Sequence, residues 1–175
     1  MKLSDLGFMG MMISPDYGGY GMDVKSYGLG QEEIRKVDAS TRLGMGVKNS
    51  LVCLGIEAFG SEEQKKKYLI PLAQGKKDGE LYIGAFLLSE PEAGSDATSQ
   101  RTTAEAKQDH YLLNGVKHWI TNGNSASCYL VFAQTDASKG SRGINVFIVE
   151  KNWPGVSVGP KENKLGIRGS DTHSI

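Results

Sequence analysis

The chain has 175 residues, which is enough for one average domain or for two small domains that share a core. Hydrophobic residues make up 39% of it and charged residues 23%, an ordinary composition for a globular protein. The 20 basic side chains balance the 20 acidic ones, and no apolar run approaches the ~20 residues that cross a bilayer. These numbers argue against nucleic acid and against a membrane as partners.

The first part of the chain has helical periodicity. The apolar residues 1–12 predict a core helix and not a signal peptide, because Asp5 interrupts them and no small-residue cleavage site follows. Pro15 and the glycines after it predict an irregular connection, and Asp23 is a plausible N-cap for a helix that runs to about Val37. The inner side of that helix would carry Val24, Tyr27 and Ile34.

Two further helices are expected before residue 80. The first should start after Ser40 or Thr41 and end at Gly60 in the left-handed conformation. Its inner face would carry Leu43, Val47, Leu51, Leu54 and Ala58. The segment Ser61–Gln64 has the form of a capping box, which opens a helix that Gly75 ends. The inward residues of this last helix would be Tyr68, Leu69 and Leu72.

From Leu81 the pattern changes to that of strands. Residues 83–88 form a short apolar run that ends in a polar loop. Residues 111–113 and 116–119 flank Asn114-Gly115, the strongest short-range signal for a type I′ hairpin. Further strands are expected at residues 128–134 and 144–149.

This change of periodicity predicts an α+β fold in two parts. A helical domain is expected at residues 1–80, and a small antiparallel β-domain, either a sheet or a barrel, at residues 81–175. Cys53 and Cys128 form no CxxC pair, which favours a reducing compartment such as the cytoplasm. The histidines are scattered without ligand spacing, so no zinc site is expected, and the sequence has no P-loop or Rossmann motif.

Two segments of the second part could contact a ligand. In the loop from Ser89 to Asp96, Gly94 lets the backbone approach a ligand and Ser95 adds a hydroxyl beside its own amide. Such a turn can cradle a phosphate, although a generic tight turn would use the same residues. Trp119 and Thr121 place an aromatic body beside a hydroxyl donor, which suits a flat ring with heteroatoms at its edge. The alternative is a core tryptophan followed by a threonine at a strand end.

Together, these segments closely resemble the acyl-CoA dehydrogenase family. The sequence of residues 164–170 is most similar to short-chain members such as butyryl-CoA dehydrogenase. The matching segments occur in family order and are residues 15–21, 59–65, 88–96, 113–122 and 164–170. The resemblance implies an N-terminal helical domain, a middle β-domain and a C-terminal helical bundle. This chain would contain most of the first domain, nearly all of the second and none of the third. Its link from Gly75 to Ile83 is a few residues longer than is usual in the family.

The resemblance also implies that FAD is the cofactor and lies between the β-domain and the bundle. The residues expected to contact FAD are Phe86, Leu88, Ser89, Gly94, Ser95, Trp119, Ile120 and Thr121. Gly94 and Ser95 would approach the pyrophosphate, and the Thr121 hydroxyl would lie near flavin N5, where a neutral donor stabilises negative charge arriving on the ring. The residues expected near the acyl-CoA substrate are Ser95, Ser170 and Thr172.

The family reaction removes the α-proton of an acyl-CoA thioester and transfers the β-hydride to flavin N5, which gives a trans-2-enoyl-CoA. The family's base is a glutamate of the C-terminal bundle, and Glu90 matches a different glutamate, so this chain is expected to contain no catalytic residue and to be inactive alone. The parent protein would be a homotetramer of the cytoplasm or mitochondrial matrix that passes electrons to an electron-transfer flavoprotein. The alternatives are an acyl-CoA oxidase or flavin monooxygenase of the same superfamily, or a non-catalytic remnant.

Overall fold

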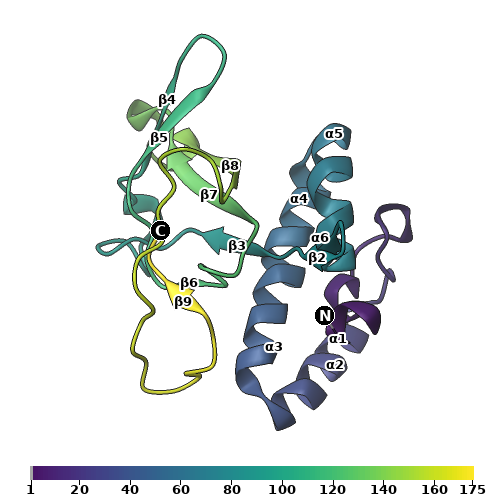
Figure 1. Ribbon diagram of the computed structural model, residues 1–175. Helices are drawn as coiled ribbons and strands as arrows, with labels where there is room; N and C mark the ends of the chain where they lie inside the picture. Colours follow the sequence, from purple (N-terminus) through teal and green to yellow (C-terminus); the bar gives the residue numbers. More distant parts are fainter. Residues whose placement is uncertain (1) are drawn as a thin grey trace.

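Helices fill the first part of the chain and strands the second in the computed structural model, which describes residues 2–175 (Figure 1). The helical lobe contains α1 (Lys2–Asp5), η1 (Phe8–Gly10), η2 (Pro15–Tyr17), α2 (Val24–Val37), α3 (Ala39–Gly46), η3 (Val47–Cys53), α4 (Leu54–Phe59), α5 (Glu62–Gln64), η4 (Lys65–Leu69) and α6 (Ile70–Gln74). The remaining elements are β1 (Lys76–Lys77), β2 (Glu80–Leu81), β3 (Gly84–Leu87), η5 (Ala97–Ser99), β4 (Thr103–Ala106), β5 (Tyr111–Asn114), β6 (Ile120–Thr121), β7 (Cys128–Gln134), η6 (Ala137–Gly143), β8 (Ile144–Glu150) and β9 (Thr172–His173). The expected α+β class is confirmed. Over residues 2–175, no helix has the length and apolar character that crossing a membrane requires.

Most of the expected helix start and stop signals are present. The Asp23 carboxylate accepts a hydrogen bond from the Ser26 amide at 2.7 Å and opens α2. The capping box at Ser61 is complete, and Gly75 ends α6 with φ at 69°. Val24 was expected on the inner side of α2 but is exposed, because it is the first helical residue after the cap.

One continuous helix runs from Ala39 to Phe59 as α3, η3 and α4. It begins earlier than expected, because Asp38 is its N-cap: the carboxylate accepts hydrogen bonds from the amides of Ser40 and Thr41 at 2.9 and 3.2 Å. At its other end Gly60 is extended, with φ at −74°, and not left-handed as expected.

The buried face of this long helix also differs from the expectation. Its middle segment, η3, is π-helical, and such a segment has hydrogen bonds from residue i to i+5, which turn the following side chains to another side of the helix. Leu51 and Ala58, expected inside, are exposed. The fully or almost fully buried apolar residues are instead Met45, Val52, Cys53 and Ile56.

The π-helical segment also buries two polar residues side by side. Lys48 and Asn49 have no exposed surface. The Lys48 ammonium donates to the Met9 carbonyl, and the Asn49 amide donates to the Phe8 carbonyl at 2.9 Å. These two bonds hold η1 against the long helix. The expected single core helix over residues 1–12, of which the structure describes residues 2–12, is therefore wrong, since Gly7 breaks it with φ at 80° and the carbonyls after it bind outside their own segment.

We expect replacement of Lys48 by Met to flatten the alkaline part of the stability profile. Burial lowers the pKa of the Lys48 ammonium from its ordinary value of 10.5, so below pH 10.5 the unfolded chain binds a proton more readily than the folded chain. The wild-type free energy of unfolding therefore rises with pH up to about 10.5, and Lys48→Met loses this rise. Urea unfolding at a series of pH values measures it. Lys66→Met, at an exposed lysine, is the control, and equal slopes in wild type and Lys48→Met would contradict the prediction.

The sheet of the second lobe is mixed and not purely antiparallel as expected. Its strand order is β3-β7-β4-β5, with β8 also paired to β7. β7 runs parallel to β3 and β4 and antiparallel to β8. The parallel pair of β3 and β7 arises because the long connection between these strands returns the chain to the same end of the sheet before β7 begins.

The expected hairpin at Asn114-Gly115 is also wrong. β5 pairs with β4, from Thr103 opposite Asn114 to Ala106 opposite Tyr111, so the turn lies at residues 107–110. Gly115 instead allows the main chain to pass close to Thr102, because a Cβ at this position would lie 2.3 Å from Thr102 Oγ1. A tight hairpin that the sequence analysis did not predict joins β1 and β2 through Asp78-Gly79, both of which have positive φ.

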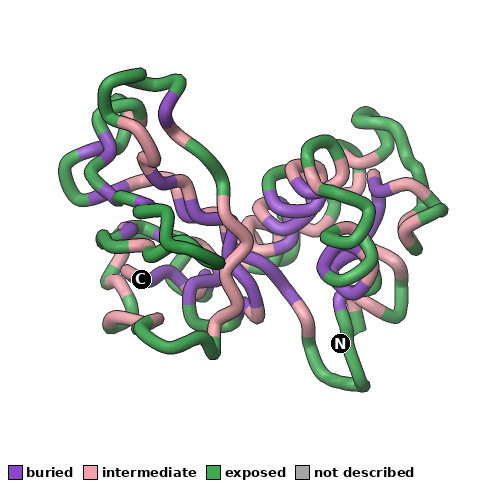
Figure 2. Tube along the Cα trace, turned by 90° about the horizontal axis from the view of Figure 1, so that it is seen from above, coloured by how far each residue is buried: buried purple, intermediate pink, exposed green. Residues whose placement is uncertain are grey.

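β3 connects the two lobes and contributes to both cores. Its alternate residues Ala85 and Leu87 pack in the sheet lobe with Tyr129 and Val131. Phe86 points the other way and packs against the core of the helical lobe. Figure 2 shows buried stretches of both lobes meeting where β3 passes between them.

Candidate functional site

Two of the segments expected at the flavin lie against each other. The His118 amide donates to the Ser89 carbonyl at 2.8 Å, which joins the end of β3 to the segment that carries Trp119. Directly after Trp119, β6 pairs with β9, and Thr121 lies opposite Thr172. The fold thus brings together residues expected at FAD and a residue expected at the acyl-CoA substrate.

Trp119 is not a core residue. The residue is 55% exposed, and its φ of 61° lies in the left-handed region, which large residues rarely adopt. Its ring meets the His118 ring edge-on, with centroids 4.9 Å apart. The alternative of a core tryptophan is therefore wrong. A strained backbone that presents an aromatic ring to solvent is typical of a ligand contact.

Thr121 and Ile120 follow with different exposures. Ile120 is buried in the core of the sheet lobe, whereas Thr121 is half-buried. Asn122 ends the segment, again with positive φ, and its amide donates to the Gly44 carbonyl at 3.0 Å and to the Gly84 carbonyl at 3.3 Å. This one side chain fixes the position of β6 against both α3 and β3.

The loop of Gly94 and Ser95 is open to solvent. Both residues are exposed, and nothing lies within 4 Å of where a Cβ on Gly94 would stand. The Asp96 carboxylate fixes the loop by accepting from the hydroxyls of Ser99 and Thr98 at 2.5 and 2.7 Å, and these bonds lower its pKa. Over residues 2–175, no hydrogen bond joins Gly94 or Ser95 to residues 119–121.

Phe86, the predicted flavin residue that lies within β3, packs on the side of the helical lobe. Its ring packs on Phe132 at a centroid distance of 4.9 Å. Both rings line a cavity of about 340 Å³ between the long helix and the sheet. Leu88 and Ser89 are half-buried like Phe86 and follow the end of β3, where the His118 amide donates to the Ser89 carbonyl.

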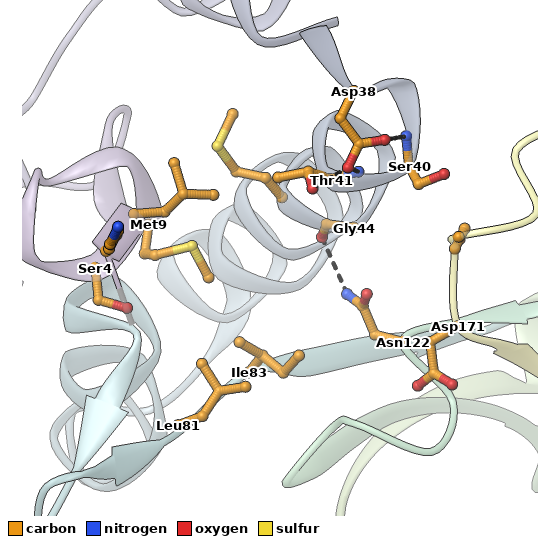
Figure 3. A pocket seen from close by; sticks show the side chains of 15 residues that line it. Ser4, Met9, Asp38, Ser40, Thr41, Gly44, Leu81, Ile83, Asn122 and Asp171 are labelled. Atoms are coloured by element: carbon orange, nitrogen blue, oxygen red, sulfur yellow. Dashed lines mark hydrogen bonds between the residues drawn. The ribbon is translucent and has the colours of Figure 1, made fainter.

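Ser170 and Thr172 are both buried, and they differ in their contacts. The Lys164 ammonium donates to the Ser170 carbonyl at 2.8 Å and to the Thr172 hydroxyl at 2.5 Å. The Ser170 hydroxyl is buried and has no partner among the described residues. It borders a cavity of about 580 Å³ between the lobes, around which Figure 3 shows Met9, Ile83 and the Asn122 amide that reaches Gly44.

A buried polar cluster that the sequence analysis did not predict lies behind the end of β3. Lys117 and Glu90 form an ion pair at 2.8 Å, with side chains only 3% and 6% exposed. The Glu90 carboxylate also accepts hydrogen bonds from the amides of Arg101 and Thr102 at 2.5 and 3.0 Å. The available signal was a lysine between Val116 and His118 in a predicted strand, together with a glutamate in the predicted flavin loop.

These bonds make Glu90 a poor proton acceptor. Burial alone would raise the pKa of its carboxyl, but the hydrogen bonds from Arg101, Lys117 and Thr102 outweigh burial and lower the pKa to about 2. A carboxylate held in this way keeps its charge and does not accept a proton at neutral pH.

Both parts of the chain match models of known domains. Residues 1–76 match the acyl-CoA dehydrogenase N-terminal domain, and residues 85–175 match the acyl-CoA dehydrogenase middle domain. The fold and these matches define the class of protein as one built on a helical domain followed by a middle β-domain. The chain belongs to the acyl-CoA dehydrogenase family. Neither match includes residues 77–84, which contain the Asp78-Gly79 hairpin turn.

The relatives include short-chain enzymes. The chain is 47% identical over 174 residues to the short-chain specific acyl-CoA dehydrogenase of Clostridium acetobutylicum, an alignment that covers 99% of this chain and 45% of the relative. The solved structure of butyryl-CoA dehydrogenase from Megasphaera elsdenii matches with a TM-score of 0.92 at 45% identity, over 99% of this chain and 45% of that one. The acyl-CoA dehydrogenase of Bacillus anthracis complexed with FAD matches with a TM-score of 0.88 at 38% identity, over 99% and 28%. The chain thus spans less than half the length of these relatives.

We expect Glu90→Gln to destabilise the protein most at neutral pH. Because the folded pKa of Glu90 is below its ordinary 4.5, the ionised form contributes stability that is complete above about 4.5 and is lost as pH falls toward about 2. Removing the charge of one partner of a buried ion pair typically costs about 3–5 kcal/mol of unfolding free energy. Denaturant unfolding at several pH values should show this deficit shrinking in acid.

The control is Glu92→Gln, which breaks an exposed ion pair with Arg101. Exposed pairs contribute little, so this variant should stay close to wild type at every pH. A Glu90→Gln deficit that is constant with pH would show that the carboxylate charge is not what stabilises the cluster.

Proposed function

We propose that this chain forms the flavin-facing and acyl-CoA-facing part of a flavin-dependent acyl-CoA dehydrogenase. The reaction is the α,β-dehydrogenation of an acyl-CoA thioester to a trans-2-enoyl-CoA. The observation that carries the proposal is the exposed, backbone-strained Trp119 beside Thr121, joined to the end of β3 by the bond between His118 and Ser89. The names of the relatives favour short-chain substrates.

FAD is the proposed cofactor, and the residues present fit it. FAD, when bound, supplies the acceptor for a hydride at N5. The exposed indole of Trp119 offers a flat apolar surface for a ring system, and no hydrogen bond within residues 2–175 occupies the Thr121 hydroxyl, which leaves it able to donate. The residues proposed to contact FAD are Phe86, Leu88, Ser89, Gly94, Ser95, Trp119, Ile120 and Thr121. Those proposed near acyl-CoA are Ser95, Ser170 and Thr172.

The remaining features of the parent protein are proposals of the same kind. The two domains would be residues 1–80 and 81–175. The base would be supplied from outside this chain, a view supported by the hydrogen-bonded, low-pKa carboxylate of Glu90. The electron acceptor would be an electron-transfer flavoprotein, the assembly a homotetramer, and the location the cytoplasm or the mitochondrial matrix.

Replacing Trp119 by Ala should weaken FAD binding about tenfold. Stacking on an aromatic ring contributes about 0.5–1.5 kcal/mol beyond simple burial, and the exposed indole makes no core contact whose loss would unfold the chain. The measurement is a titration of the purified chain with FAD, followed through the flavin band near ~450 nm after desalting. Trp153→Phe, at the other partly exposed tryptophan, is the control. Equal affinity of Trp119→Ala and wild type would remove Trp119 from the site.

Thr121→Val should change the reduction potential of the bound flavin without changing the stability of the fold. The change keeps the shape of the side chain and removes only the hydroxyl, so the unfolding midpoint should hold while the reduction potential of bound FAD becomes more negative. Potentiometric titration of the bound flavin measures this effect. An unchanged potential would place the Thr121 hydroxyl away from N5. A wild-type chain that stays colourless would favour the non-catalytic alternative for these residues on their own.

A further inference from the structure

The Lys117 side chain is fully engaged within the protein. Its ammonium donates to the Leu88 carbonyl at 3.0 Å, to Glu90 Oε1 at 2.8 Å and to Gln100 Oε1 at 2.8 Å. An ammonium has three donors, so all three are used, and the side chain is 3% exposed. Two of these acceptors are side chains, but the third is the main chain at the end of β3.

The main chain of Lys117 is anchored as well. Its amide donates to the Ile175 carbonyl at 2.8 Å, and its carbonyl accepts from the Ile175 amide at 2.9 Å. The next residue, His118, bonds to Ser89, and Trp119 follows. Lys117 is therefore the point at which the segment of Trp119 is fixed to the strand end that carries Leu88 and Ser89.

We propose that Lys117 is a positioning residue of the flavin site, which sets the spacing between the Leu88–Ser89 strand end and Trp119. This inference rests on the proposed function, because it concerns the two segments that would contact FAD. Glu90 in turn connects Lys117 to the segment of Arg101 and Thr102, since its carboxylate also accepts hydrogen bonds from the amides of these two residues.

A purely stabilising ion pair is the competing explanation, and the contacts separate the two roles. The bond to Glu90 neutralises the charge of Lys117, and a pair of neutral residues could replace that effect. The bond to the Leu88 carbonyl has no such substitute, because losing it leaves the carbonyl of a half-buried residue without its donor. A variant that removes both charges therefore tests positioning apart from charge burial.

The test compares the double variant Lys117→Met/Glu90→Gln with wild type, both carrying Trp153→Phe so that Trp119 is the only tryptophan. Two readouts are measured: the FAD dissociation constant with the visible spectrum of the bound flavin, and the quenching of Trp119 fluorescence by acrylamide without FAD. We expect at least about a tenfold weaker FAD affinity, an altered flavin spectrum and stronger quenching of Trp119. The unfolding midpoint of each variant shows that it is folded.

The matched control is Lys107→Met/Glu105→Gln, which removes an exposed lysine–glutamate pair from the same lobe and should change neither readout. A folded Lys117→Met/Glu90→Gln variant with wild-type quenching of Trp119 would overturn the positioning role. So would a variant with wild-type affinity and flavin spectrum.

Failure of the proposed function gives a different result. If wild type itself binds no FAD, the proposed site fails for these residues, and the quenching of Trp119 still decides whether Lys117 holds the segment. If wild type binds FAD and the double variant binds it equally well, the flavin site stands and the positioning role falls.

Discussion

The structure depends on β3, because this short strand belongs to two cores at once. Gly84–Leu87 crosses from the helical lobe to the sheet, and its alternating side chains pack in opposite directions. Gly84 permits this crossing, since a Cβ there would lie 2.6 Å from the Val52 side chain. A shift of either lobe along β3 would therefore remove side chains of β3 from one of the two cores. The strand end that carries Leu88 and Ser89 is fixed in position for the same reason.

Buried polar groups then fix the relative positions of segments that apolar packing alone does not determine. Apolar contacts have little directional preference, whereas an amide or an ammonium without a partner is costly to bury, so such a group specifies one arrangement. The chain uses this device at Asn49 to hold η1, at Asn122 to hold β6 against both lobes, and at Lys117 to hold β3. Each donates to a main-chain carbonyl far away in sequence. The positions of segments without regular structure are set in this way.

The sequence predicted the local signals well and the long-range ones poorly. The caps at Asp23 and Ser61 and the helix end at Gly75 depend on a few neighbouring residues, and all three are confirmed. The buried face of the long helix depends on a π-helical turn that no short pattern predicts. The Asn114-Gly115 turn failed because a tertiary contact with Thr102, and not hairpin geometry, requires that glycine. For the candidate site, the motif segments were visible in the sequence, but the burial of Lys117 beside Glu90 was not, because it depends on segments that meet only in the fold.

The shortness of β6 has a consequence for the site. Two residues, Ile120 and Thr121, make a strand too short to be stable by its own hydrogen bonds, and residues with positive φ stand on both sides of it. Strain of this kind persists only where the surroundings determine the conformation. Here Ile120 is anchored in the sheet core, Asn122 binds both lobes, and β9 pairs along the strand, so the cost of the strained backbone is offset by contacts of distant segments. The result is a rigid support that carries an exposed indole and a Thr121 hydroxyl without a hydrogen-bond partner among residues 2–175. Because Thr172 lies opposite Thr121, a displacement of β9 would also displace β6. The residues proposed to contact the cofactor in β6 and the substrate in β9 are therefore held in position by the same strand pair.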